Sequence, residues 1–501
     1  MAMLKREHAW QYVMAVTLAT GIALRLTLLF LQRDLWVDEC MLVLGVIWQP
    51  LPMLYEPLPY LQQAGVGYVW LLKGMSVLFG NSELSFRAMS MLASIAALPL
   101  FAWLLRRGAL HRGIAALILL MAAINPLLLQ YAGDAKQYSL DGLLALIMLT
   151  VFRSPLRERL VVMLPLLVFG VLASHPFVFV AAAFCVAWAM ELRRVLHARL
   201  LLCAAVTAGV FLAHYFLFID RGLDTVLHND FMLWYHNVGF APVAFWEAET
   251  WSWYFGKVSS LFNSMMGFRW MIFGLLPVVF GVAELMRRKE WSFLVLLLLP
   301  LLFAMAASAL HLYSVRDRLL LFTLPSLLLL LGYGIEYLRA SLNRRSAAFV
   351  LLAFFVAVGV IYPVYGLAQR FARYGDLGTK EEIGAAFRYV QEHRREGEAL
   401  HVAWNVYPNI SYYCERDGVP YPAPVAPGVF PPNPTGVREF AVQIAADVGA
   451  RGWAIISHHR IHGLHVLDTL RGMGYSISGF TSEPDGSAGA YLLRKEEGAQ
   501  K

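Results

Sequence analysis

Long uninterrupted runs of apolar residues recur along most of this chain. Trp291 to Leu310 contains no charged residue, and neither does Leu319 to Ile335. Each run approaches the ~20 residues that an α-helix needs to cross the hydrocarbon core of a bilayer. The runs lack the alternation of membrane β-barrel strands, and backbone polar groups in lipid must be satisfied within one element. The pattern therefore predicts a bundle of membrane-spanning helices.

The polar breaks between these runs divide them into about eleven membrane-spanning helices. The expected spans are 10–31, 84–105, 113–130, 138–152, 160–175, 177–192, 200–218, 269–286, 291–310, 319–338 and 347–366. The first span begins with basic residues, but it is too long for a signal-peptide core and lacks a small-residue cleavage site. We interpret it as an uncleaved anchor.

Basic residues in the breaks predict the orientation of the bundle. They form six clusters, and an even number of spans separates each cluster from the next. The clusters are Lys5 and Arg6; Arg106, Arg107 and Arg112; Arg153, Arg157 and Arg159; Arg193, Arg194 and Arg199; Arg287, Arg288 and Lys289; and Arg339, Arg344 and Arg345. The positive-inside rule places all six in the cytoplasm, with the N-terminus inside and the C-terminus outside.

The bulk of the polar sequence falls on the predicted outer side. We expect a membrane domain over residues 1–366, with outer-face loops at 32–83 and 219–268, and a small soluble α/β domain over 367–501. This tail carries 14 Lys plus Arg against 15 Asp plus Glu, a balance of −1, in contrast to the basic membrane part. The predicted fold class is an α-helical polytopic membrane protein with a C-terminal α/β domain.

The tail alternates between helix-like and strand-like patterns. Its amphipathic stretches predict helices at 380–395, 437–448 and 465–473, and its short apolar runs predict strands at 399–404, 452–457, 475–480 and 490–494. It contains no Gly-rich phosphate-binding loop, so we expect an accessory role for this domain.

Composition agrees with a membrane protein. Hydrophobic residues make up 59% of the 501 positions, charged residues 15%, and the mean hydropathy is +0.58, which excludes an ordinary soluble protein. The net charge of +7 is dispersed among short loops, so no nucleic-acid partner is expected. Four cysteines make no disulfide framework; Cys40 and Cys414 both fall on the predicted outer side, where a bridge between them is one possibility.

Two adjacent acids, Asp38 and Glu39, follow directly after the first span. Carboxylates so close to hydrocarbon need an explanation. A carboxylate at this place is suited to act as a general base that takes a proton from an acceptor hydroxyl, and Asp38 is the candidate. The alternative is structural: Asp38 caps a short interfacial helix that runs through Met41 to Trp48.

A second polar cluster, Gln130 to Ser139, forms a turn between two spans on the same predicted side. Lys136 would hold a phosphate and stabilise negative charge on a leaving group, while Asp134 would orient the acceptor or the cation. In the alternative interpretation the turn is simply solvated, and Lys136 reaches toward lipid phosphates.

A third cluster, His311 to Arg318, places cations on the outer side, against the usual orientation bias. Arg316 or Arg318 would bind a phosphate through two hydrogen bonds, or would instead pair with Asp317 for structural reasons. Arg87, near the outer start of the second span, is a further candidate for the same phosphate.

The outer loop at 220–268 is rich in aromatic residues, including Trp234, Tyr235, His236, Trp246, Trp251, Trp253, Tyr254 and Phe255. Such residues either stack on sugar rings or form an interfacial belt, and the belt is the more common case. His175, His214 and His228 show no metal-binding spacing, so neither a metal nor another cofactor is predicted, although a divalent metal remains compatible with the sequence.

Four motifs occur in a characteristic order. They are Trp36-Val37-Asp38-Glu39; Leu78-Phe79-Gly80-Asn81-Ser82-Glu83 leading into Phe86-Arg87; Tyr131-Ala132-Gly133-Asp134-Ala135-Lys136-Gln137-Tyr138-Ser139; and Arg318-Leu319-Leu320-Leu321-Phe322-Thr323-Leu324-Pro325. In this order they resemble the GT-C class of membrane glycosyltransferases, in particular the family of dolichyl-phosphate-mannose protein mannosyltransferases and bacterial aminoarabinose transferases.

The resemblance implies a polyprenyl-phosphate-linked sugar donor and an inverting single displacement, with Asp38 as the catalytic acid of the Asp-Glu pair and Glu39 in support. Lys136, Arg316, Arg318 and Arg87 would bind the donor phosphate. Asp134 and Tyr138 would contact substrate, as would Glu56 and Gln63 of the Pro-containing first outer loop.

The tail does not resemble the β-trefoil insertion of the eukaryotic mannosyltransferases, which favours a bacterial-type enzyme. We therefore expect a multi-pass protein of the bacterial cytoplasmic membrane, with its C-terminal domain in the periplasm. Its partners would be the lipid-linked donor, membrane lipids, and an envelope lipid, glycan or protein as acceptor. The alternatives are a lipid-linked glycan ligase or polymerase, and a transporter or flippase.

Overall fold

The chain forms two compact units. The computed structural model describes residues 2–31, 33–155, 160–191, 198–221, 239–342, 344–374, 381–402, 406–421, 436–457, 464–481 and 488–496. The first unit, the helical unit, consists of Met1–Leu31, Leu51–Met75 and Arg87–Leu367. The second unit consists of Gln32–Pro50, Ser76–Phe86 and Ala368–Lys501. It therefore includes two segments of the first outer loop as well as the tail that the sequence marks as a separate domain.

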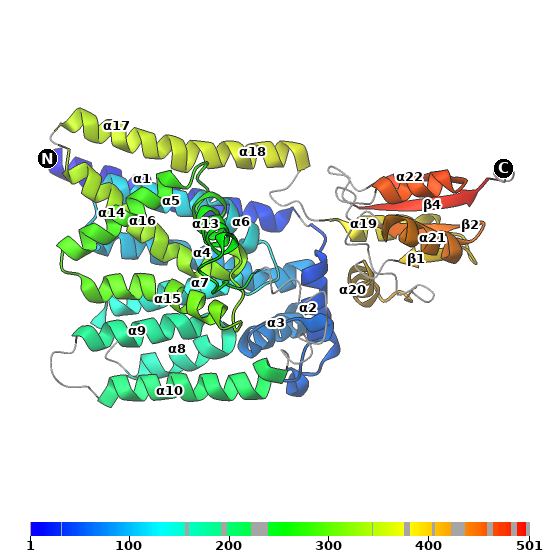
Figure 1. Cartoon of the computed structure of the whole chain (residues 1–501), viewed down its shortest axis with the longest axis horizontal. Helices are drawn as coiled ribbons and strands as arrows, with labels where there is room; N and C mark the ends of the chain where they lie inside the picture. Colours follow the sequence, from blue (N-terminus) through cyan, green and yellow to red (C-terminus); the bar gives the residue numbers. More distant parts are fainter. Residues whose placement is uncertain are drawn as a thin grey trace. The chain divides into compact units, whose positions relative to one another are not determined.

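Helices make up most of the helical unit (Figure 1). They are α1 (Ala2–Phe30), α3 (Val66–Phe79), α4 (Glu83–Arg107), α5 (Arg112–Ile124), α6 (Pro126–Ala132), α7 (Tyr138–Phe152), α8 (Leu160–Ala173), α9 (Phe177–Glu191), α10 (Ala198–His214), α13 (Ala248–Ser260), α14 (Ile272–Arg287), α15 (Trp291–Ala309), α16 (Leu324–Ala340), α17 (Arg345–Val356) and α18 (Tyr362–Tyr374). Short 3-10 segments are η1 (Leu51–Met53), η2 (Pro59–Leu61) and η6 (Asp317–Thr323); π-helical segments are η4 (Tyr215–Ile219), η5 (Leu261–Met265) and η7 (Ala357–Ile361).

Each span expected from hydropathy coincides with a helix. Among the described residues, six helices are long and apolar enough to cross a membrane, and a seventh span is formed if α5 and α6, which are bent by 47°, count as one. The helices α7, α8, α9 and α14 also stand at expected spans but are shorter, at 15, 14, 15 and 16 residues. The chain is thus a multi-pass helical membrane protein, and the sidedness of the membrane stays a prediction.

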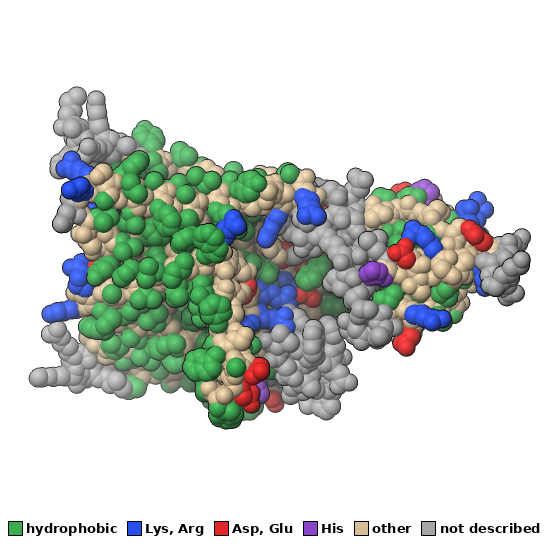
Figure 2. Space-filling view, turned by 45° about the horizontal axis from the view of Figure 1, so that its top comes forward, with side chains coloured by type: hydrophobic (Ala, Val, Ile, Leu, Met, Phe, Trp, Pro, Cys, Tyr) green, Lys and Arg blue, Asp and Glu red, His purple; other side chains and the backbone are tan. Residues whose placement is uncertain are grey.

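Several basic loops meet at one end of the helical unit. Figure 2 shows a broad cover of hydrophobic side chains over this unit, with Lys and Arg at the end where α17 begins and a second group of them well away from that end. Contacts between loops at this end join Arg153 to Glu290, Arg288 to the carbonyl of Gly108, and the N–H of His111 to Glu336. Four of the six basic clusters therefore share one end, as the positive-inside pattern requires.

Helices α14 and α16 of the helical unit pack closely through two glycines. A Cβ on Gly281 would lie 1.9 Å from the carbonyl oxygen of Leu330, and one on Gly334 would lie 1.7 Å from that of Pro277. Lipid supplies no hydrophobic force between helices, so close backbone packing of this kind contributes much of the attraction between them.

Replacing Gly334 with Ala is expected to destabilise the protein by about 1–3 kcal/mol, because the backbones of α14 and α16 must separate to admit the methyl group. Thermal unfolding in detergent measures the effect. Gly209→Ala in α10 is the matched control, since a Cβ there meets nothing within 4 Å. Equal midpoints for the two variants would contradict the tight packing.

The second unit contains a four-stranded sheet with the order β1-β2-β4-β3. The strands are β1 (Ala399–Val402), β2 (Arg451–Ile456), β3 (Tyr475–Thr481) and β4 (Gly489–Lys495); β1 and β2 are parallel, and the other neighbours are antiparallel. Its helices are α2 (Val37–Trp48), α19 (Ile383–His393), α20 (Tyr407–Asp417), α21 (Gly436–Val448) and α22 (Leu464–Gly472). Every helix and strand expected in the tail is present, which confirms the predicted α/β class.

Helices cover both faces of this sheet. Leu400 pairs with Trp453, whose ring contacts Tyr389 of α19 with centroids 6.0 Å apart. The next residue of β1, His401, points to the other face and bonds Asp447 of α21 at 2.7 Å. Burial of His401 lowers the pKa of its imidazole, although the Asp447 carboxylate opposes this shift. The helix α20 was not expected from the sequence.

Candidate functional site

The candidate catalytic and binding residues belong to both units of the chain. Asp38 and Glu39 belong to the second unit, and the other candidates belong to the helical unit. Within the helical unit, the turn around Lys136 connects α6 to α7 and is buried: Asp134 is 2% exposed and Lys136 8%. The alternative of a simple solvated turn is therefore wrong. The Lys136 ammonium donates a hydrogen bond to Gln62 Oε1 at 2.6 Å.

Neighbouring polar groups hold this turn in place. Ser90 Oγ of α4 donates to the carbonyl of Lys136 at 2.6 Å, and Tyr68 of α3 lies 3.3 Å from the same hydroxyl. Gln137 Nε2 donates to the carbonyl of Gln63 at 3.4 Å. The turn is thus bonded directly by two separate segments of the chain, and α3 contacts it only through Ser90.

The arginine-rich segment lies beside the same turn. The guanidinium carbon of Arg318 is 5.9 Å from the centroid of the Tyr138 ring, a cation–π contact between η6 and the start of α7. Asp317, which the sequence offered as a partner for an arginine, accepts a hydrogen bond from Ser260 Oγ at 2.5 Å. Lys136 and Arg318 are thereby brought to one end of the helical unit.

Helix α13 supports the arginine-rich segment from its other side. Lys257 donates to the carbonyl of Val315 at 2.7 Å, one turn before the Ser260–Asp317 bond. Burial lowers the pKa of the Lys257 ammonium, while nearby Asp317 opposes this shift and Arg316 adds to it. The segment that carries Arg316 is therefore held at two points by one helix.

Two other predicted residues lie in different surroundings. Glu56 forms an ion pair with Arg221 at 3.5 Å, with both side chains partly exposed. Arg87 is 5% exposed in the second turn of α4, one turn before Ser90. Arg87 therefore lies close in sequence to Ser90, which bonds the Lys136 turn, whereas Glu56 is paired with Arg221.

A pocket opens inside the helical unit next to this turn. Its polar lining residues are Arg25, Ser94, Tyr138 and Ser139, and its apolar ones are Ala97, Leu98, Phe101, Ala122, Leu128, Gly142, Leu143, Leu146, Leu321, Leu324, Pro325 and Leu328. Arg25 is 1% exposed and donates to Ser94 Oγ at 2.7 Å and to the carbonyls of Gly21 and Ala123, each at 2.9 Å. The walls suit a hydrocarbon chain.

In the second unit, the acidic pair stands at the N-terminus of α2. Glu39 is fully buried, and its carboxylate accepts the Trp36 N–H at 3.0 Å. It thus caps the helix, which is the role that the structural alternative gave to Asp38. Asp38, the second residue of α2, is partly exposed. The Glu39 carboxylate is therefore buried and caps α2, whereas the Asp38 side chain is partly accessible to solvent.

Several further expectations have outcomes in the structure. Trp246, Trp251 and Phe255 are 83%, 60% and 62% exposed, which fits both an interfacial belt and a surface that stacks on sugar rings. Trp234, Tyr235, His236 and His228 lie outside the described residues. Cys40 and Cys414 are free thiols. In the ranges that the structure covers, no group of three or more His, Cys, Asp and Glu side chains is arranged to hold a metal ion.

Comparison with known proteins identifies the architecture. No protein-family model and no curated protein matches the sequence. The structure matches the oligosaccharyltransferase of Archaeoglobus fulgidus in its apo form, with a TM-score of 0.51 and 13% identity over 98% of this chain and 75% of that one. The chain has the GT-C fold.

Two further matches are weaker. ArnT from Cupriavidus metallidurans gives a TM-score of 0.46 at 11% identity in its apo state and 0.45 at 13% identity when bound to undecaprenyl phosphate, each over 94% of this chain and 97% of that one. The GT-C fold that the ordered motifs implied is thus confirmed by the archaeal enzyme. In this chain the helical unit contains the buried turn with Lys136, and the second unit contains Asp38 and Glu39 at the start of α2.

Sequence reasoning missed Gln62, Ser90 and Tyr68, which contact Lys136 directly or through one hydroxyl. These uncharged side chains follow no motif. A partial signal existed for Gln62, because it stands beside Gln63 in the loop that the family resemblance had already selected.

Proposed function

We propose that this protein transfers a sugar from a polyprenyl-phosphate-linked donor to an envelope lipid, glycan or protein on the outer face of a bacterial cytoplasmic membrane. The observation that carries the proposal is the Lys136 turn. Lys136 is 8% exposed, and its ammonium donates a hydrogen bond at 2.6 Å to Gln62 Oε1, beside a largely apolar pocket that begins at Tyr138. A lysine ammonium at this place is suited to bind an anionic headgroup through charge-assisted hydrogen bonds.

The adjacent pocket supports a lipid-linked donor. Tyr138 and Ser139 follow Lys136 by two and three residues and line a pocket whose other walls are largely leucine. In the proposal, the donor phosphate binds Lys136 with help from Arg316, Arg318 and Arg87, and the first part of its hydrocarbon chain enters the pocket. Asp134, Tyr138 and Gln63 contact the headgroup. We assign no substrate contact to Glu56 while it pairs with Arg221.

The proposed reaction is a single displacement. The acceptor oxygen attacks the anomeric carbon and forms the new glycosidic bond, while the bond from that carbon to the phosphate oxygen breaks. The electron pair leaves with the polyprenyl phosphate, whose added charge the lysine and arginines stabilise. The Asp38 carboxylate takes the proton of the acceptor hydroxyl. The anomeric configuration inverts, and Glu39 supports Asp38 by fixing the start of α2.

The decisive experiment supplies the purified full chain in lipid with a panel of polyprenyl-phosphate sugars, each labelled in the sugar. We expect at least one donor to lose its sugar and release polyprenyl phosphate when acceptor lipids or glycans are present. Movement of intact donor between leaflets without cleavage would instead support the transporter. Cleavage only of donors that carry long glycans on a diphosphate would support the ligase or polymerase.

A further inference from the structure

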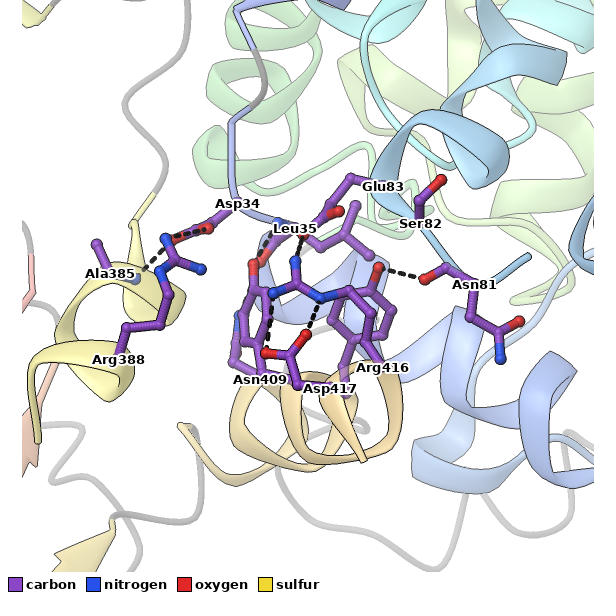
Figure 3. Close-up of polar contacts among 12 residues, drawn as sticks. Asp34, Leu35, Asn81, Ser82, Glu83, Ala385, Arg388, Asn409, Arg416 and Asp417 are labelled. Atoms are coloured by element: carbon purple, nitrogen blue, oxygen red, sulfur yellow. Dashed lines mark hydrogen bonds and ion pairs between the residues drawn. The ribbon is translucent and has the colours of Figure 1, made fainter. Parts of the chain in front are cut away.

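Asp34 and Leu35, which stand just before the N-cap of α2, are bound by the C-terminal part of the second unit (Figure 3). Asp34 Oδ2 accepts the N–H of Ala385, in the first turn of α19, at 2.8 Å, and Arg388 of the same helix lies 3.3 Å from Oδ1. A carboxylate at a helix N-terminus is favoured by the helix dipole. Its approach is close, because a Cβ on Gly384 would lie 2.8 Å from Asp34 Oδ1.

The main chain of Leu35 is held by side chains of α20. Asn409 Nδ2 donates to the Leu35 carbonyl at 2.8 Å, and the Tyr413 hydroxyl accepts the Leu35 N–H at 3.1 Å. All three residues are fully buried. Buried backbone groups require partners, and here α20 supplies both of them. Burial, reinforced by nearby Asp34, raises the pKa of the Tyr413 phenol well above its usual value.

The same helix binds the other end of α2 and a second segment of the first outer loop. Trp48 Nε1, on the last residue of α2, donates to Glu415 at 2.9 Å. The Tyr412 hydroxyl donates to the carbonyl of Asn81 at 2.8 Å, and Arg416 pairs with Glu83. Helix α20 therefore bonds both Leu35, just before the N-cap of α2, and Trp48, the last residue of α2.

These contacts affect the position of Asp38, because only a short hydrogen-bonded stretch of backbone connects Leu35 to it. Trp36 is the N-cap of α2, and its carbonyl accepts the N–H groups of Glu39 and Cys40 at 2.8 and 2.9 Å. Only the N-cap separates Leu35 from the helix, so a fixed Leu35 sets the starting point of α2, and the bond from Trp48 to Glu415 restrains its other end. The Asp38 carboxylate moves with the start of α2, since Asp38 is the second residue of the helix.

We propose that α19 and α20 position the proposed general base, and that Asn409 and Tyr413 are positioning residues for Asp38. This inference rests on the proposed function, because it assigns the C-terminal domain a part in the same reaction. The domain then acts on the rate of the chemical step, although none of its residues needs to touch substrate.

The first test compares two single-atom changes in the full-length protein. Tyr413→Phe removes the hydroxyl that bonds Leu35, while Tyr475→Phe removes one that bonds the carbonyls of Ala445 and Gly449 within the sheet domain. We expect Tyr413→Phe and Asn409→Ala to lower kcat by about 10- to 100-fold, the cost of a small misplacement of a reacting group, with KM for the donor unchanged. Tyr475→Phe should keep the wild-type kcat.

The second test separates positioning from general stability. In combination with Asp38→Asn, Asn409→Ala should cause no further loss of kcat, because both changes remove the same contribution. A multiplied loss, an unchanged kcat in Asn409→Ala and Tyr413→Phe, or a rise in KM alone would each overturn the proposal.

A third measurement does not depend on activity. Amide hydrogen exchange over Asp38 to Met41 should become faster in Tyr413→Phe and stay at the wild-type rate in Tyr475→Phe. Unchanged exchange in both variants would overturn the positioning role even if activity fell. If Asp38→Asn retained full activity, the proposed function would fail, whereas faster exchange in Tyr413→Phe would still support the hold of α20 on α2.

Discussion

Replacing Asp38 with Asn is expected to lower the rate of sugar transfer by about 10²- to 10⁴-fold, the usual contribution of a general base. The amide has nearly the shape of the carboxylate but accepts no proton, so binding of the donor should persist. The measurement is the initial rate of donor cleavage by the purified variant in lipid, together with the affinity for polyprenyl phosphate.

A matched substitution controls for the loss of a carboxylate in the second unit. Asp468→Asn changes a side chain that is 68% exposed and pairs with Arg471 within α22. It should retain the wild-type rate. Because the Glu39 carboxylate, and not that of Asp38, bonds the N–H of the N-cap residue Trp36, the start of α2 should keep its cap in Asp38→Asn and the variant should remain folded. A variant that is fully folded and fully active would remove Asp38 from the mechanism.

Replacing Lys136 with Met is expected to raise KM for the donor by about 10- to 100-fold, as follows from losing a charge-assisted hydrogen bond of about 1.5–3 kcal/mol. The rate should fall as well, because the charge on the departing phosphate grows during the reaction. Lys136→Arg, which keeps the charge, should recover part of both losses.

The control for this prediction lies at the other end of the helical unit. Lys289→Met removes a cation from the loop between α14 and α15, next to the Glu290 that pairs with Arg153. It should leave KM for the donor unchanged. If the two methionine variants raised KM equally, the effect would be one of general membrane charge, and Lys136 would have no specific role in phosphate binding.

Most of the membrane architecture could be predicted because lipid leaves the backbone little choice. A chain in hydrocarbon must bond its own peptide groups, so an apolar run such as Trp291–Ala309 has a helix as its stable form. Breaks within a span were less predictable. The range 113–130 was expected as one span, but it is divided into α5 and α6, bent by 47°, where Pro126 follows Asn125.

The site was predictable only where charge made it visible. Lys136 and Asp38 stand out because ionised groups near hydrocarbon are costly and therefore informative. Ser90 and Gln62 are ordinary polar residues whose role depends on where α4 and the first outer loop pack. For Arg25, the sequence shows a charge within the first span but not the partners of that charge. These partners, Ser94 and the carbonyl of Ala123, are distant in sequence.

Helix α20 carried a local signal that the sequence analysis did not use. Pro408 stands near its start and Gly418 follows its end in the left-handed region, with φ of 66°. Proline early and glycine after the last turn are typical helix boundaries. Its contact with Leu35 had no such signal, because hydrogen bonds between distant segments leave no periodic pattern in a single sequence.

The distance along the chain between Leu35 and Asn409 also bears on biosynthesis. The two residues are 374 positions apart, so at about 5–20 residues per second a ribosome needs roughly 20–75 s to make the second after the first. The membrane helices between them are translated during this interval. In the proposed mechanism, a nascent chain acquires its ordered base only after nearly all of it has been synthesised, and a product truncated before α20 would be inserted yet inert.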